Sequence, residues 1–105
     1  MSRNDRALTG APASVARFQE AFSAPSRVAV LRELMREPMT FATLHAALGD
    51  TQARPTIYSA LNGLLDMGYV TDDAPGQRKK KTTLFRAERA LVLEDIAAVL
   101  VYVVG

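Results

Sequence analysis

The sequence predicts a mainly α-helical fold with one small β-hairpin, in which four helices precede two strands and a last helix follows them. Apolar residues recur at helical spacing in four runs between residues 12 and 67. A turn signal at residues 74–76 then separates two short runs that suit strands. A short helix, a turn, a longer helix and a hairpin are therefore expected over residues 40–86, which is the sequence form of a winged helix-turn-helix.

Length and composition indicate a single small domain. We expect residues 1–10 to form a flexible tail and residues 11–105 to form one winged helix-turn-helix domain. The formal net charge is only +2, but five basic residues and no acid lie between Gly76 and Ala87. The lack of cysteine excludes disulfides, thiolate metal sites and thiol nucleophiles. No apolar run spans a bilayer or forms a secretory signal, so we expect a soluble, cytoplasmic protein.

Prolines delimit the first two expected helices. Pro12 suits the first turn of a helix that Pro25 ends, and Ser26 is placed to cap a second helix that stops at Pro38. The apolar faces of these helices comprise Val15, Phe18 and Phe22, and then Val28, Leu31, Leu34 and Met35.

The third and fourth helices form the helix-turn-helix. Thr40 caps the third helix, and Gly49 and Asp50 make the turn. Pro55 sets the start of the fourth helix and Gly68 ends it. The expected inward faces comprise Phe41, Leu44, Leu48, Ile57, Leu61, Leu64 and Leu65.

The hairpin and the last helix complete the domain. A first strand begins at residues 69–71, a second returns over residues 79–86, and residues 72–86 form the wing. The last helix, residues 88–104, is apolar on almost every face. Such a helix must be buried all round, and 105 residues have too little mass to cover it.

We therefore expect a twofold homodimer in which helices 12–22 and 88–104 of one chain pack against those of its copy. The expected interface residues are Val15, Phe18, Phe22, Leu91, Val92, Ile96, Val99, Leu100 and Val103.

Two stretches resemble the ArsR family of winged-helix repressors. AFSAPSRVAVLREL (21–34) is similar to the run AL-x-D-P-T-R-L-x-I-L-x-L that joins the first two helices of that family. PTIYSALNGLLDMGYV (55–70) is similar to its recognition helix, T-V-S-x-H-L-x-x-L-x-x-A-G-L-V. The matching positions are Phe22, Pro25, Ser26, Arg27, Val28, Val30, Leu31, Thr56, Ile57, Leu61, Leu64, Gly68 and Val70.

The resemblance covers roughly residues 12–104 and implies a winged helix that binds DNA. The chain departs from the family pattern between Gly49 and Ile57, where it has two residues more. It also lacks the cysteines and the histidine pair that bind metal in the sensing members. The resemblance therefore implies a regulator that does not sense metals through those sites, and we expect no cofactor.

The fourth helix, residues 55–67, is the expected recognition helix. Its polar face carries Tyr58, Ser59 and Asn62, which we expect to contact base edges, since asparagine can pair with adenine. Residues near the helix start are placed for phosphates, because a helix N-terminus favours anions. This second set comprises Thr51, Gln52, Arg54 and Thr56, and we add Thr40 to the DNA-binding residues.

The wing carries the strongest cationic run. Its tip, comprising Arg78, Lys79, Lys80 and Lys81, is expected to bind the DNA backbone or minor groove with salt-sensitive affinity. Arg86 lies on the return strand and is within reach of either the backbone or Asp72 and Asp73.

Other polar residues are interpreted structurally. His45 is the only histidine, and one imidazole cannot hold a metal. Two interpretations are open for Glu94 and Asp95. They could form ion pairs with Arg17 or Arg89, or they could form an acidic metal site. Ion pairing is favoured, because two carboxylates alone are weak ligands for transition metals. Arg27 is either structural or close to phosphate.

The leading hypothesis is a homodimeric transcriptional regulator, most simply a repressor, that binds a pseudo-palindromic operator in double-stranded DNA. The alternative is a winged helix that docks another protein and binds little or no specific DNA. No enzyme signature is present, and no partner in a membrane is expected. The means of control is left open: a small organic molecule between the dimer helices, a partner protein, or no ligand at all.

Overall fold

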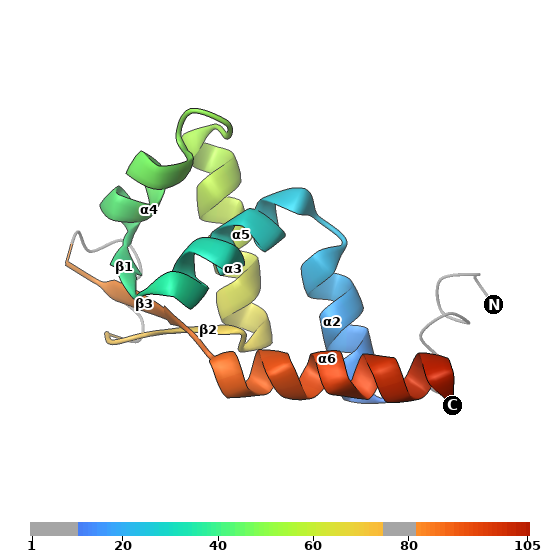
Figure 1. The fold of residues 1–105 in the computed structure, drawn as a ribbon. Helices are drawn as coiled ribbons and strands as arrows, with labels where there is room; N and C mark the ends of the chain where they lie inside the picture. The colour runs from blue at the N-terminus through green and yellow to red at the C-terminus, as the bar shows by residue number, and fades with distance from the viewer. Residues whose placement is uncertain (1–10, 75–81) are drawn as a thin grey trace.

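The chain follows the expected order of elements and adds one strand (Figure 1). A computed structural model describes residues 11–74 and 82–105, and within those ranges it contains five helices and three strands. The expected tail, residues 1–10, and the tip of the expected wing, residues 75–81, lie outside the described residues. The elements are α2 (Ala13–Phe22), α3 (Pro25–Arg36), β1 (Met39–Thr40), α4 (Phe41–Leu48), α5 (Arg54–Met67), β2 (Val70–Asp72), β3 (Leu84–Ala87) and α6 (Arg89–Val104).

The sheet is antiparallel and has the order β1-β3-β2. The hairpin strands β2 and β3 were expected, and Val70 pairs with Ala87. The prediction of only two strands was wrong, because Met39 pairs with Phe85 and thereby adds β1 at the other edge of β3. A strand of two residues is too short to show an alternating pattern, so its presence depends on a partner far along the chain.

Local chemistry sets the ends of the helices. Thr40 caps α4 as expected, since its hydroxyl accepts a hydrogen bond from the Thr43 amide at 3.3 Å. Gly68 ends α5 in the left-handed conformation, with φ of 87°, which a residue without a Cβ adopts readily. The expected cap at Ser26 was wrong, because α3 begins at Pro25 and has Ala24 before it without a side-chain cap. Proline has a φ close to the helical value and suits the first helical turn, so the helix starts two residues earlier than a cap at Ser26 would place it.

The hydrophobic core lies between α3, α4, α5 and the sheet. The inward positions expected for the helix-turn-helix are confirmed, apart from Phe41 and Leu65, which are half-buried at its margin. The largest fully buried apolar side chains are Tyr69, Phe85, Leu44, Ile57, Leu61, Leu64, Val30 and Val70. This core fixes α5 on one side and leaves its opposite side to solvent.

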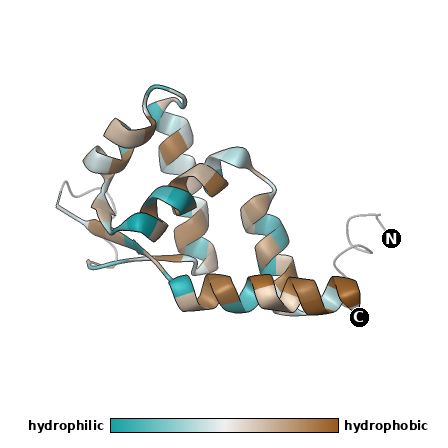
Figure 2. Cartoon of the chain, viewed as in Figure 1, coloured by the Kyte–Doolittle hydropathy of each residue, from teal (hydrophilic) through white to brown (hydrophobic). Residues whose placement is uncertain are grey.

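Helix α6 runs beside α2 along one end of the molecule (Figure 1). Val15 and Val92, both expected at a dimer interface, are instead buried within the chain. The second half of α6 stays uncovered, and Figure 2 shows its end as strongly hydrophobic. Large apolar residues exposed on α6 are Leu93, Leu100, Val101, Tyr102, Val103 and Val104. Among the described residues, no helix is both long and apolar enough to cross a membrane.

Candidate nucleic-acid interface

Helices α4 and α5 form a helix-turn-helix joined by residues 49–53. The stripe of α5 that contains Ile57, Leu61 and Leu64 is buried against the core. The opposite face of α5 carries exposed Ser59 at its N-terminal half and exposed Asp66 near its C-terminal end. A carboxylate repels phosphate, so this face suits nucleic acid in its N-terminal half.

The three expected base readers differ in how freely they face solvent. Ser59 is exposed. The Tyr58 ring is half-buried and meets the Phe41 ring edge-on, with 5.7 Å between their centres. Asn62 is half-buried, and its Nδ2 donates a hydrogen bond to the Tyr58 carbonyl oxygen at 3.1 Å. This bond uses one of the two Nδ2 donors, so the orientation of the Asn62 amide is partly set by its own helix.

The residues expected to contact phosphate lie around the start of α5. Arg54 and Thr56 are exposed, as is Thr51 in the preceding turn. Gln52 is half-buried, and its Oε1 is buried with no hydrogen-bond partner among the described residues. Arg54 and Thr56 are therefore better placed for phosphate than Gln52.

Thr40 has a local role in the helix-turn-helix. Its hydroxyl contacts both the amide and the hydroxyl of Thr43, the latter at 3.1 Å. These contacts make Thr40 the N-cap of α4. Contact between Thr40 and DNA stays a prediction.

The described part of the wing presents one cation. Arg86 is exposed on β3, opposite Thr71 on β2, and has no ion-pair partner within residues 11–74 and 82–105. Of the two acids considered as its partners, Asp73 instead accepts a hydrogen bond from the Leu84 amide at 3.0 Å. The other expected wing cations, Arg78, Lys79, Lys80 and Lys81, lie outside the described residues.

Sequence reasoning missed an aromatic cluster next to this surface. The Arg54 guanidinium carbon lies 4.9 Å from the centre of the Phe41 ring, which also contacts Tyr58 and His45. Phe41 and His45 are four residues apart on α4, and this spacing was the available signal. The contact with Arg54 depends on how α4 and α5 cross.

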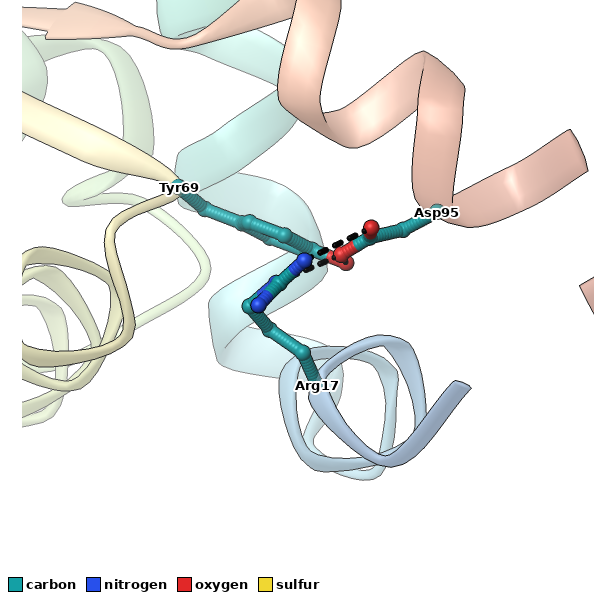
Figure 3. Close-up of polar contacts among 3 residues, drawn as sticks. All are labelled: Arg17, Tyr69 and Asp95. Atoms are coloured by element: carbon teal, nitrogen blue, oxygen red, sulfur yellow. Dashed lines mark hydrogen bonds and ion pairs between the residues drawn. The ribbon is translucent and has the colours of Figure 1, made fainter. Parts of the chain in front are cut away.

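A buried ionic network connects α2 and α6 with the residue that follows the C-cap of α5 (Figure 3). Arg17 on α2 donates two hydrogen bonds to Asp95 on α6, from Nε at 2.7 Å and from Nη2 at 2.9 Å. Tyr69, which follows the C-cap of α5, donates its hydroxyl to the same carboxylate at 2.7 Å. Only 1% of the Asp95 side chain is exposed, against 30% for Arg17. Of the two pairings open for Asp95, the structure has the one with Arg17.

The network shifts the ionisation of its three members. Burial opposes the charged form of Asp95, but the hydrogen bonds from Arg17 and Tyr69 and the charge of Arg17 outweigh it, so the pKa of Asp95 is lowered. The hydrogen bond to Asp95 raises the pKa of Arg17. Burial and the hydrogen bond to Asp95 raise the pKa of Tyr69. At neutral pH the network therefore holds one anion, one cation and a neutral phenol.

The lowered pKa of Asp95 predicts an acid-sensitive fold. A carboxyl whose pKa is lower in the folded state stabilises the fold above its unfolded pKa, and this stabilisation is lost as pH falls through the folded pKa. We expect the free energy of unfolding, measured by urea denaturation, to fall as the pH is lowered below about 5, because Asp95 is protonated at higher pH in the unfolded chain than in the folded one. The Asp95→Asn variant should have a flatter acid limb than the wild type. Equal slopes in the two proteins would exclude Asp95 as a source of the acid sensitivity.

Arg27 has a structural role. Its Nη1 donates a hydrogen bond to the Glu20 carbonyl oxygen at 2.7 Å, near the end of α2. A Cβ placed on Gly63 of α5 would lie 3.0 Å from Arg27 Nε, so the guanidinium passes closely over that helix. Arg27 therefore joins α2, α3 and α5.

Within the described residues, no group of three or more histidine, cysteine or acidic side chains is placed to hold a metal ion.

Comparison with solved structures confirms the resemblance at the level of the fold. An ArsR-family transcriptional regulator is 23% identical, with a TM-score of 0.61, over 87% of this chain and 84% of that one. A possible transcriptional regulatory protein from Mycobacterium bovis is 23% identical, with a TM-score of 0.60, over 88% of this chain and 92% of that one. The transcriptional repressor BigR from Xylella fastidiosa is 19% identical, with a TM-score of 0.61, over 97% of each chain. No family model and no curated protein matches the chain.

The chain thus has the ArsR-like winged helix-turn-helix fold, with a three-stranded antiparallel sheet and mainly helical structure.

Proposed function

We propose that this protein is a sequence-specific regulator of transcription that binds double-stranded DNA, with α5 in the major groove and the wing, residues 72–86, on the adjacent backbone. The observation that carries the proposal is the solvent-facing N-terminal half of α5, with Arg54, Thr56 and Ser59 exposed on a helix whose other side is locked into the core. The solved structures of similar fold are described as transcriptional regulators, which supports the proposal.

The wing supplies the non-specific part of the proposed affinity. Arg86 is exposed on β3, and the sequence places four further cations at positions 78–81. Phosphate contacts by such cations release counterions and give affinity that falls with salt. Together with groove contacts from α5, they would fix the orientation of the domain on the duplex.

A homodimer is part of the proposal. The exposed apolar surface of α6 gives the observation that supports it, because side chains such as Leu100 and Val103 are uncovered in the single chain. In a twofold dimer, two α5 helices would meet two half-sites of a pseudo-palindromic operator. Repression would follow where the bound dimer covers a promoter.

Selection from a random-sequence duplex library tests the proposal directly. Repeated capture on immobilised protein, followed by sequencing, should enrich two inverted half-sites separated by about one helical turn. A library that remains random after selection would contradict sequence-specific binding. In that case the winged helix would be examined as a surface that docks another protein.

Removal of the central wing cations should weaken binding to every duplex. We expect the variant with Lys79, Lys80 and Lys81 changed to Ala to bind selected and unrelated DNA more weakly, because up to three phosphate contacts are lost. The slope of log affinity against log salt should become less steep by roughly 2 to 3. Fluorescence anisotropy at several salt concentrations measures this slope.

A control variant uses cations that belong to neither α5 nor the wing. Arg32 and Arg36 are exposed on α3, and their replacement by Ala removes positive charge from that helix alone. That variant should keep the wild-type salt slope. A wild-type slope in the triple-lysine variant would remove the wing tip from the proposed mechanism.

A further inference from the structure

The Phe41 ring is the centre of the aromatic cluster beside α5, because the other members each contact it. Phe41, the first residue of α4, is half-buried and packs against the core, so its ring is held in place. Arg54 lies over this ring, with its guanidinium carbon 4.9 Å from the ring centre. The Tyr58 ring meets the Phe41 ring edge-on at an interplanar angle of 80°. The His45 ring lies parallel to the Phe41 ring, with 6.2 Å between the ring centres.

The polar ends of two of these side chains remain open. Arg54 is exposed and, within residues 11–74 and 82–105, makes neither a hydrogen bond nor an ion pair. Its contact with Phe41 is a cation–π interaction, which uses the face of the guanidinium and leaves its N–H donors at the edge available. The Tyr58 hydroxyl likewise has no hydrogen-bond partner in the described part of the chain. One ring, that of Phe41, therefore orders two side chains whose donors are not used by other groups in the described part of the chain.

We propose that Phe41 is a positioning residue for DNA binding, whose ring holds Arg54 and Tyr58 ready to donate hydrogen bonds to backbone phosphates at the start of α5. The inference rests on the proposed function. A guanidinium presents paired donors that match phosphate oxygens. A long side chain that is ordered before binding loses less conformational freedom when the complex forms, so its contact adds more to affinity. Phe41 itself acts through the two neighbours.

The first test compares Phe41→Leu with Arg54→Ala on a labelled duplex carrying the selected site. Phe41→Leu removes the aromatic face but keeps an apolar side chain at the core margin, and we expect affinity to fall about 5-fold. The salt slope should stay at the wild-type value, because Arg54 is still present to neutralise phosphate. Arg54→Ala should weaken binding and reduce the slope by about 1. Phe41→Tyr retains the ring and should bind like the wild type.

A double-mutant cycle separates positioning from general loss of packing. If Phe41 acts through its neighbours, the Phe41→Leu change should have less than half its effect on affinity in a background that carries both Arg54→Ala and Tyr58→Ala. Leu65→Ala is the matched control, since Leu65 is also half-buried at the core margin but belongs to the C-terminal half of α5. Its effect on affinity should be the same in both backgrounds. An undiminished effect of Phe41→Leu in the double-alanine background would overturn the inference.

A second readout uses the free protein and needs no DNA. Protons of Arg54 that lie over an aromatic face are shifted upfield by the ring, so the Arg54 δ-proton resonances should move downfield in Phe41→Leu and stay in place in Phe41→Tyr. Unmoved resonances would show that the ring does not hold Arg54, and would overturn the inference even if DNA binding is confirmed. Ring-shifted resonances in a protein that binds no duplex would instead refute the proposed function, and with it the role of Phe41 in DNA binding.

Discussion

We expect replacement of Arg17 by Met to lower the free energy of unfolding by about 3 kcal/mol, because it leaves the buried Asp95 carboxylate without its cation. Methionine keeps the length and apolar stem of the side chain, so the loss reports mainly on charge and hydrogen bonding. Urea denaturation at neutral pH measures the effect. Arg36→Met is the matched control: Arg36 pairs with Glu33 at 3.2 Å on an exposed surface, and its loss should cost at most about 0.5 kcal/mol.

A triple variant tests whether the cost arises from an uncompensated charge. Arg17→Met combined with Tyr69→Phe and Asp95→Leu replaces the whole network by apolar side chains. Buried ion pairs are often replaced in this way with little loss, so the triple variant should be more stable than Arg17→Met alone. A triple variant that is less stable than the single one would show that packing by these side chains, rather than the buried charge, dominates. Equal stability of Arg17→Met and the wild type would contradict the ionic role altogether.

Two glutamates on the exposed face of α6 should abolish the proposed dimer. Leu100 and Val103 are 61% and 74% exposed in the single chain, so Glu at both positions leaves the fold of the monomer intact. In a twofold interface each carboxylate occurs twice and enters an apolar contact, and we expect the dissociation constant to rise by a factor of about 100 or more. Light scattering after gel filtration should report a mass near the 11.4 kDa of one chain.

The control for this experiment lies on the same helix. Ala90 is exposed in the first turn of α6, away from the apolar end, and Ala90→Glu should keep the wild-type mass. Circular dichroism should show the same helical content in both variants. A stable dimer of the Leu100→Glu, Val103→Glu variant would place the interface elsewhere, and a wild-type protein of 11.4 kDa would contradict the dimer itself.

The helices of this fold could be predicted from the sequence because their signals are local. Proline at the helix starts, Gly68 at the end of α5 and Thr40 before α4 each act within one turn of the chain. The buried stripe of α5 follows from helical spacing alone. By contrast, β1 is two residues long and exists because Met39 pairs with Phe85. The local sequence around Met39 does not indicate this pairing.

The site could be predicted only in part, for a similar reason. Which residues of α5 face outward follows from periodicity, but how far each is available depends on neighbours from other elements. Tyr58 is partly covered by Phe41, and the amide of Asn62 bonds within its own helix. For α6, the apolar composition indicated burial all round. Composition could not show that only one face of its first half is covered by the chain itself, at Val92, while apolar side chains near its C-terminal end, such as Leu100 and Val103, are left open.

The measurement that most directly tests the central claim is a titration of purified protein into two duplexes, the DNA upstream of its own gene and an unrelated fragment of equal length. We expect saturable binding to the upstream fragment that persists at moderate salt, and much weaker binding to the unrelated fragment that disappears there, because groove contacts survive salt better than phosphate contacts. Such a result would support a sequence-specific regulator. Weak binding to both fragments that vanishes together as salt is raised would contradict it.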